Sequence, residues 1–499
     1  MDLNWSLDEL YISFKSKEFL DDINILDDLI NNISKIKDSL SNSDPKDIIE
    51  EYINKLLEFT LINSKLSNYV NLKISVNTKD NMALKYNDII ENKLTEIVGP
   101  STIIEKYISS VENIDDIISE SEILKTHEFY LQEIINNSKY LLSEQEENII
   151  ANMKNTGSSA WSKLKDNLVS SLMVEIDNKE YPLTVVLNMA YDKDRDIRKK
   201  AYDAEIKSYS KIDEAVASSL NAIKGEVITV SKLRGYKSPL DMTLHNSRMD
   251  KETLDAMFSA LVDSLPIFRK YLRRKAEMLG YNNGLPFYEL YAPIVENDMK
   301  FTYEEAGDYV EKNFRTFSED LGNYARNAIN KRWIDVMPKE GKVGGAFCEN
   351  LNSIGESRIL LNFGGNFGDV ITMAHELGHG YHGECLKNET ILNSDYPMPI
   401  AETASTFCET IVKNAAIKEA NDIDALAILE NDLSDNTQVI VHIYSRFLFE
   451  DNFFKKREES SLSVEEIKEL MLDAQRKAYG DGLDNNYLHP YMWLWKPHY

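Results

Sequence analysis

Residues 374–383 read AHELGHGYHG and hold three of the eight histidines of a 499-residue chain. His375 and His379 are four residues apart, and Glu376 directly follows the first of them. Residues four apart lie on one face of an α-helix, so the two imidazoles can turn toward one point and hold a Zn²⁺ at ~2.0–2.1 Å. Chance gives on the order of 0.01 such motifs in this composition. The pattern therefore predicts a zinc-binding helix.

Glu376 suits the role of a catalytic base beside such an ion. It points about 100° away from His375 around the helix, so its carboxylate would reach a zinc-bound water rather than the ion. Zinc lowers the pKa of a bound water to about 7. Glu376 would take the proton as that water attacks a peptide carbonyl, and then pass it to the leaving amine.

A catalytic zinc needs a third protein ligand. His382 lies on the same helix face but about 10 Å along the axis from His375, so we interpret it as a supporting or packing residue. A metzincin pattern would require Gly at 382 and His at 385, where this chain has His382 and Cys385. Glu402 and Glu409, seven apart on the next expected helix, both remain candidates, and Glu402 comes first after the proline-bearing loop.

The surroundings of the motif differ from the rest of the chain, because ten of the 20 glycines fall between residues 341 and 383. GGAFCEN (344–350) indicates a glycine turn, and ESRILLNF (356–363) indicates a strand. Asp369 is expected to cap the motif helix, and 401–416 begins another helix. A strand, a motif helix and a second helix are typical of a zinc site of the HExxH type.

The fold class expected from the whole chain is mainly α. The first 98 residues contain no glycine and one proline, and SDPKDIIEEYINKLLEF (43–59) shows a cap followed by one apolar stripe. MVEIDNKEYPLT (173–184) indicates a short hairpin around Asp177-Asn178. We expect an N-terminal helical domain at 1–185 and a catalytic domain at 186–499.

Composition excludes several classes of function. The formal charge of −27 argues against nucleic-acid binding, which needs a basic surface. No run of 18 apolar residues predicts a membrane span, and no secretory signal is visible, so we expect a cytoplasmic protein. Three cysteines are too few for a disulfide framework and are expected to be buried as small apolar residues.

The motifs together carry a family resemblance. H-E-L-G-H-x-x-H at 375–382, A-E-T-A-S-T-F-C-E at 401–409, GGAFC before an ILLNF strand, and NWSLDELY at 4–11 are similar to oligoendopeptidase F-type zinc metallopeptidases, relatives of thimet oligopeptidase. The resemblance implies the zinc ligands His375, His379 and Glu402, with Glu376 as the base. It further implies that Glu409 supports the ligands, as a carboxylate that orients a ligand histidine does.

The resemblance also implies a large helical fold with a deep substrate channel that admits short, unstructured peptides. A small β-sheet beside the HExxH helix would pair its edge strand with the substrate, and ESRILLNF matches that strand. Peptide-contacting residues would come from the glycine turn and from the end of the chain: Gly344, Gly345, Ala346, Phe347, His498 and Tyr499.

One departure from the family concerns the C-terminus, which reads YLHPYMWLWKPHY. The tyrosines and closing helices that follow in relatives are absent, so we expect a C-terminal segment to be lacking. The expected function is a zinc-dependent endopeptidase acting on short peptides, with one Zn²⁺ per chain and neither nucleic acid nor membrane as a partner. The alternative is a zinc-containing peptide-binding protein with little turnover. The sequence does not indicate the oligomeric state or the cleavage preference.

Overall fold

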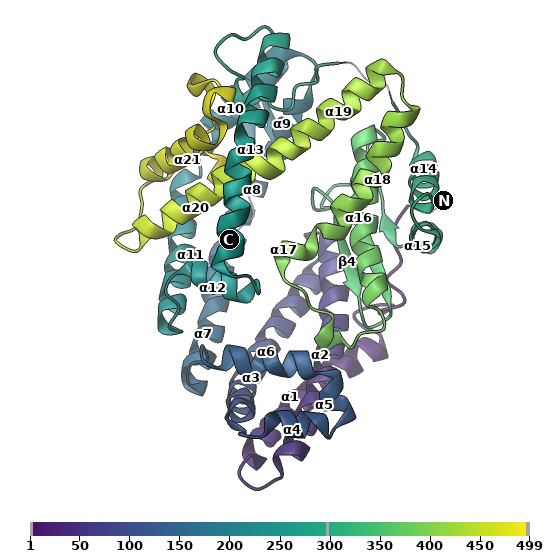
Figure 1. The fold of residues 1–499 in the computed structure, drawn as a ribbon, viewed down its shortest axis with the longest axis vertical. Helices are drawn as coiled ribbons and strands as arrows, with labels where there is room; N and C mark the ends of the chain where they lie inside the picture. Colours follow the sequence, from purple (N-terminus) through teal and green to yellow (C-terminus); the bar gives the residue numbers. More distant parts are fainter. Residues whose placement is uncertain (1–2, 296–298, 496–499) are drawn as a thin grey trace. The chain divides into compact units, whose positions relative to one another are not determined.

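The computed structural model describes residues 3–295 and 299–495 of the chain. By compactness the chain forms two units (Figure 1). Unit 1 comprises Met1–Asn152 and Asp298–Ala416, and unit 2 comprises Met153–Asn297 and Ile417–Tyr499. Each unit has its own hydrophobic core. The predicted class, mainly α with a small sheet, is confirmed. Unit 1 combines the N-terminal helices with the motif region. The expected domain boundary at residue 185 stays a prediction.

Most of unit 1 consists of helices whose ends follow sequence signals. In the helix that begins at Pro45, the side chain of Asp44 accepts a hydrogen bond from the Lys46 backbone N–H, so the expected cap is confirmed. Buried apolar side chains of the long N-terminal helices form the core. The helices are α1 (Lys17–Ser39), α2 (Pro45–Val76), α3 (Asn81–Ser110), α4 (Ile114–Ser119), α5 (Glu122–Thr126), α6 (Glu128–Ser138), most of α7 (Glu144–Thr156), α14 (Tyr303–Arg315) and α15 (Glu319–Asn330).

The sheet of unit 1 has three strands in the order β3 (Ile334–Asp335), β5 (Glu356–Leu360) and β4 (Phe347–Leu351). β4 runs antiparallel to β5, and β3 runs parallel to it. The expectation that ESRILLNF is the edge strand is wrong, because β5 has a partner on each side. The edge strand is β4. β4 begins at Phe347, so only the first three residues of GGAFCEN (344–346) precede the strand as a turn, and the rest belong to the strand.

The motif lies on α16 (Phe367–Leu386), which packs against β4 and β5. The predicted helix is confirmed, but its cap is not Asp369. Asn366 caps the helix. Asp369 completes a capping box, because its side chain accepts a hydrogen bond from the Asn366 backbone N–H. After α16 come the 3₁₀ turn η3 (Ile391–Asn393), α17 (Met398–Ala401) and α18 (Thr403–Glu419).

Unit 2 contains the predicted hairpin, β1 (Met173–Ile176) and β2 (Lys179–Pro182). Asp177 and Asn178 have φ values of 52° and 61°, the left-handed conformation that a two-residue hairpin turn requires. Helices and short turns make up the rest: α8 (Ser158–Ser170), α9 (Leu183–Asn188), η1 (Met189–Tyr191), α10 (Arg195–Tyr209), α11 (Asp213–Leu233), α12 (Pro239–Asn246), α13 (Lys251–Met278), η2 (Phe287–Glu289), α19 (Asp422–Thr437), the π-helix η4 (Gln438–His442), α20 (Ile443–Arg457), α21 (Val464–Tyr479), η5 (Gly480–Gly482), η6 (Asn485–Tyr487) and α22 (Met492–Trp495).

Two further expectations concern the whole chain. Among the residues that the structure describes, no helix has the length and apolar character to cross a membrane. All three cysteines are free. Cys408 is buried and Cys348 is partly buried, but Cys385 is exposed, so the expectation of burial is wrong for Cys385.

Candidate metal centre

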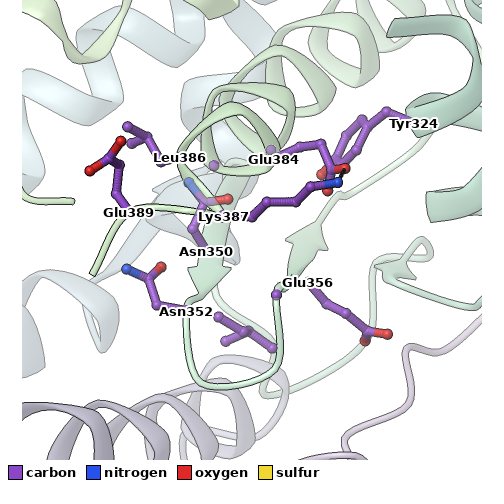
Figure 2. A pocket seen from close by; sticks show the side chains of 12 residues that line it. Tyr324, Asn350, Asn352, Glu356, Glu384, Leu386, Lys387 and Glu389 are labelled. Atoms are coloured by element: carbon purple, nitrogen blue, oxygen red, sulfur yellow. Dashed lines mark hydrogen bonds and ion pairs between the residues drawn. The ribbon is translucent and has the colours of Figure 1, made fainter. Parts of the chain in front are cut away.

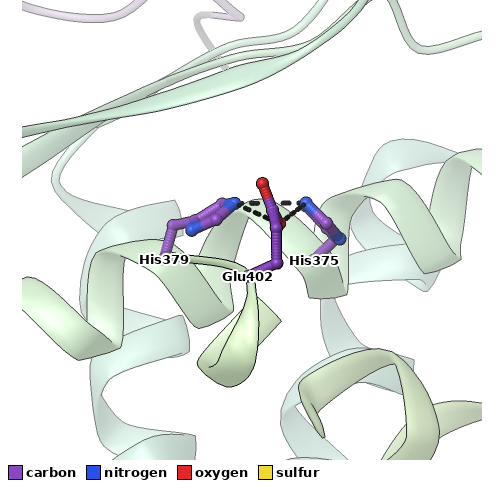
Figure 3. Close-up of side chains that lie close together, drawn as sticks. All are labelled: His375, His379 and Glu402. Atoms are coloured by element: carbon purple, nitrogen blue, oxygen red, sulfur yellow. Dashed lines mark hydrogen bonds and ion pairs between the residues drawn. The ribbon is translucent and has the colours of Figure 1, made fainter. Parts of the chain in front are cut away.

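Three side chains of unit 1 converge on one point (Figure 3). The Nε2 atoms of His375 and His379 are 3.1 Å apart, and each lies 3.2 Å from Oε2 of Glu402. The two histidines come from α16, and Glu402 comes from the turn between α17 and α18. Among the described residues, this is the group of His, Cys, Asp and Glu side chains whose spacing could hold a metal ion.

The spacing of the three atoms fits a small metal ion. Ligands bonded at ~2.0–2.1 Å in a tetrahedral arrangement lie about 3.4 Å from one another, close to the separations of His375, His379 and Glu402. Two imidazoles and one carboxylate are also a typical ligand set of a catalytic zinc, with a fourth position left open. The residues present therefore fit Zn²⁺.

Glu409 fixes the tautomer of His375. Its Oε1 lies 2.5 Å from Nδ1 of His375, and its Oε2 pairs with Lys413 at 3.0 Å. Because a carboxylate only accepts, Nδ1–H donates to it and Nε2 keeps its lone pair for a metal. Burial opposes charge on this imidazole, but the bond to Glu409 and the neighbouring carboxylates outweigh it and raise the pKa of His375.

The turn that carries Glu402 is bonded to the site on both sides. His379 has a hydrogen bond with the backbone of Ala401. The hydroxyl of Ser405 donates to Oε2 of Glu402 at 2.7 Å. Burial lowers the pKa of His379, which favours the neutral imidazole that a metal binds. The side chain of Glu402 is 57% exposed, so these contacts, rather than packing, direct it.

Glu376 lies on the buried side of α16 with 5% of its surface exposed. Its Oε2 is buried and has no hydrogen-bond partner within the described part of the chain. Burial, together with the charges of Glu402 and Glu409, raises the pKa of Glu376 to about 7 against the opposing effect of His375. A carboxyl with that pKa can both take and release a proton near neutral pH.

α16 and α18 approach closely because Gly378 has no side chain. A Cβ at this position would lie 2.8 Å from the carbonyl oxygen of Ala404 and 2.8 Å from Cα of Ser405. Two residues along, a Cβ on Gly380 would collide with the hydroxyl of Tyr324 on α15. Gly378 thus lets the helix that carries Glu409 reach the histidines, and Gly380 lets α15 pack against the same helix.

The other residues expected near the site lie apart from the three ligand atoms. His382 stacks on Tyr396, with ring centroids 4.3 Å apart, and is not part of the convergent group. Phe347 packs against Trp5, so its side chain points toward the N-terminal core.

The glycine turn lies directly before the edge strand. Gly344 and Gly345 are exposed, Ala346 follows them, and the side chain of Asn362 donates to the Gly345 carbonyl at 2.8 Å. Their substrate role stays a prediction. His498 and Tyr499 lie outside the described residues.

Asn350 of β4 is a residue that sequence reasoning missed. Its Nδ2 donates to the backbone carbonyl of His379 at 3.3 Å, which ties the edge strand to the motif helix. It also lines a small pocket between the β4–β5 turn and the last turns of α16 (Figure 2). A single asparagine in a strand carries no sequence signal for this contact.

Comparison with known families agrees with this geometry. Residues 188–495 match the profile described as Peptidase family M3, and residues 110–173 match the one described as Oligopeptidase F. The first match covers more than half of the chain. The chain belongs to peptidase family M3. Membership assigns it to a class of metalloendopeptidases and confirms the predicted family.

Curated relatives are named oligopeptidases. Oligopeptidase PepF of Bacillus subtilis (strain 168) is 26% identical over 496 residues, which are 96% of this chain and 72% of PepF. Group B oligopeptidase PepB of Streptococcus agalactiae is 25% identical over 385 residues, 75% of this chain and 64% of that protein. The chain thus spans about two thirds of the length of these relatives.

Solved structures share the fold. The crystal structure of oligoendopeptidase-F from Enterococcus faecium matches with a TM-score of 0.69 at 17% identity, over 97% of this chain and 84% of that one. Likeness at this identity shows the fold alone, and it confirms the predicted large helical peptidase fold with a small sheet.

Proposed function

We propose that the chain is a zinc-dependent endopeptidase that hydrolyses short, unstructured peptides and holds one Zn²⁺ through His375, His379 and Glu402. The observation that carries the proposal is the convergence of these three ligand atoms, each 3.1–3.2 Å from the others. The matching family profile supports the peptidase class.

The chemistry divides between the ion and the chain. A bound Zn²⁺ supplies a Lewis acid that polarises a carbonyl and makes water more acidic. Glu376, a buried carboxylate beside the first ligand histidine, would take the proton of the attacking water and deliver it to the leaving amine. Glu409 holds His375 in the tautomer that leaves Nε2 free.

We place the peptide substrate along β4. This strand has β5 on one side only, and among the described residues no strand pairs with its other edge. An extended peptide can add to such an edge through backbone hydrogen bonds. Gly344, Gly345 and Ala346 lead into the strand, and Phe347 would offer its backbone, because its side chain packs on Trp5. His498 and Tyr499 are proposed as further contacts.

The net charge and the cysteines bear on the partners and the cellular compartment of the enzyme. The net charge of −27 opposes a nucleic-acid partner. Three free cysteines suit a reducing compartment, so we propose the cytoplasm.

Hydrolysis of an internally quenched peptide of about ten residues tests the proposal, with zinc quantified on the same sample. Glu376→Gln is the control, because the amide is nearly the same size but cannot take a proton. We expect cleavage with one Zn²⁺ per chain, and a loss of about 10²–10⁴-fold in kcat in the variant, which keeps its zinc. Stoichiometric zinc without cleavage by the wild-type chain, or undiminished cleavage by the variant, would contradict the proposal.

A further inference from the structure

His127 belongs to HEFYL (127–131), a sequence that resembles the zinc motif but has Leu131 in place of its second histidine. The side chain is 1% exposed, at the junction of α5 and α6. Its Nδ1 lies 2.8 Å from the carbonyl oxygen of Ile123, and its Nε2 lies 2.8 Å from the hydroxyl of Thr390. Thr390 is 263 residues away in sequence and follows the motif helix.

Thr390 lies in the segment that carries Glu402, here called the ligand loop and defined as residues 387–402. No residue of this loop, all of which the structure describes, is buried. Apolar packing therefore contributes less to its position than in a buried helix, and polar contacts add to it. This differs from α16, where nine residues are buried.

The polar contacts attach the ligand loop to the N-terminal helices. Besides the bond between His127 and Thr390, the side chain of Asn393 donates to the Thr126 carbonyl at 2.8 Å. The turn η3 contacts α2 and α6, and Leu392 packs against the N-terminal core. Two successive residues, Thr126 and His127, thus hold the first half of the loop.

The second half of the loop is attached to the motif helix and the sheet. Tyr396 stacks on His382 of α16, and the hydroxyl of Ser394 accepts a hydrogen bond from Asn352 at 2.6 Å. Six residues beyond Tyr396, Glu402 points at the two histidines. Loss of the contact at Thr390 would leave these contacts alone to position Glu402 and, through Ala401, the imidazole of His379.

We propose that His127 is a positioning residue that holds Glu402 at the metal site through its hydrogen bond to Thr390. The inference rests on the proposed function, because it treats Glu402 as a zinc ligand. Since a carbonyl only accepts, the contact with Ile123 places a proton on Nδ1 of His127. In the neutral imidazole, Nε2 then accepts the hydroxyl proton of Thr390, so both ring nitrogens of this buried side chain are bonded.

Thr390→Val tests the inference with the smallest change, because it removes the hydroxyl and keeps the shape of the side chain. His127→Phe removes the partner. The control is Thr102→Val, which deletes a buried hydroxyl that donates to Val98 within α3. The measurements are the Zn²⁺ dissociation constant by chelator competition, the visible spectrum of the Co²⁺-loaded chain, and thermal unfolding without metal.

We expect Thr390→Val and His127→Phe each to weaken Zn²⁺ binding about 10-fold and to alter the Co²⁺ spectrum, as loss of a ligand's supporting contact does. Thr102→Val should match wild type in both. The double variant should bind Zn²⁺ as strongly as the single variant with the lower Zn²⁺ affinity. Both single changes remove the same hydrogen bond, so their effects should not add.

Wild-type affinity and spectrum in Thr390→Val would overturn the inference whether or not His127→Phe folds. So would equal weakening in Thr102→Val, which would show a general effect of lost stability. Neither of these two results would contradict the proposed function. A wild-type chain that binds no Zn²⁺ would overturn both.

Discussion

The two segments that supply the proposed metal ligands are built differently. α16 presents His375 and His379 from a helix with nine buried residues, packed on β4 and β5. The ligand loop presents Glu402 from a segment without a buried residue, held by hydrogen bonds, one ring stack and the partly buried Leu392. In Figure 1, α16 lies beside β4, and α17 lies at the end of the loop.

The proposed ligands are therefore held in place by different forces. Core packing fixes the helix that carries the two imidazoles, whereas the carboxylate of Glu402 depends on contacts that compete with water. Polar contacts of this kind contribute about 0.5–1.5 kcal/mol each, so several are needed to hold the loop. We expect changes in the loop to affect metal affinity more than stability, and changes in α16 to affect both.

The largest effect should follow from removing Glu402 itself. Glu402→Ala should weaken Zn²⁺ binding by more than 100-fold, because two imidazoles alone hold the ion poorly. Glu409→Ala should cost about 10–100-fold, as loss of a group that orients a ligand histidine. Chelator competition on the two variants ranks them. A greater loss in Glu409→Ala than in Glu402→Ala would exchange the two roles and contradict the assignment.

An intermediate effect is expected where α16 meets α18. Gly378→Ala places a Cβ 2.8 Å from backbone atoms of Ala404 and Ser405, which cannot turn away. Overpacking of this kind costs about 1–3 kcal/mol of folding free energy. The displaced helix would also carry Glu409 away from His375. Thermal unfolding and the Zn²⁺ dissociation constant should therefore both worsen.

Gly383→Ala is the matched control on the same helix. The atoms nearest to a Cβ at this position belong to the side chain of Asn350 and not to the backbone. That side chain can rotate, at the loss of its hydrogen bond to the His379 carbonyl. The loss of stability should be smaller than in Gly378→Ala. Equal losses in the two variants would show that helix contact at Gly378 is not what limits the approach of α18.

The smallest effect should come from removing the metal without mutation. Chelation takes away the interaction that ties Glu402 to α16, while the buried face of α16 is unchanged. Backbone amide exchange in residues 387–402 should accelerate on the order of tenfold, equivalent to about 1.4 kcal/mol. Exchange in Phe367–Leu386 should hardly change. Faster exchange across both segments would mean that the helix, too, depends on the ion.

The predictable part of the molecule is the part with local signals. His375, Glu376 and His379 are related by the period of one helix, so their convergence follows from spacing alone. The Asp177-Asn178 hairpin and the Asp44 cap are likewise set by neighbouring residues. Glu402 and Glu409 could not be separated in this way, because the spacing of seven placed both on one face of a single expected helix. In the structure only Glu409 lies on α18, and Glu402 lies in the turn before it.

The remaining features depend on residues far apart in the chain. His127 meets Thr390 across 263 residues, and Asn350 meets the carbonyl of His379, contacts that no local pattern encodes. ESRILLNF has the composition of a strand, but its central position in the sheet depends on where β3 and β4 pair. Asp369 resembled a cap because Asn366, three residues earlier, forms the other half of the same capping box.

The proposed activity depends on one Zn²⁺ bound at His375, His379 and Glu402. An anomalous difference map at the zinc absorption edge, from crystals of the zinc-loaded chain, tests it most directly. We predict one peak per chain, within about 2.0–2.2 Å of Nε2 of each histidine and of a carboxylate oxygen of Glu402. A peak coordinated by Glu409 or His382 instead, or the lack of a peak at these residues, would contradict it.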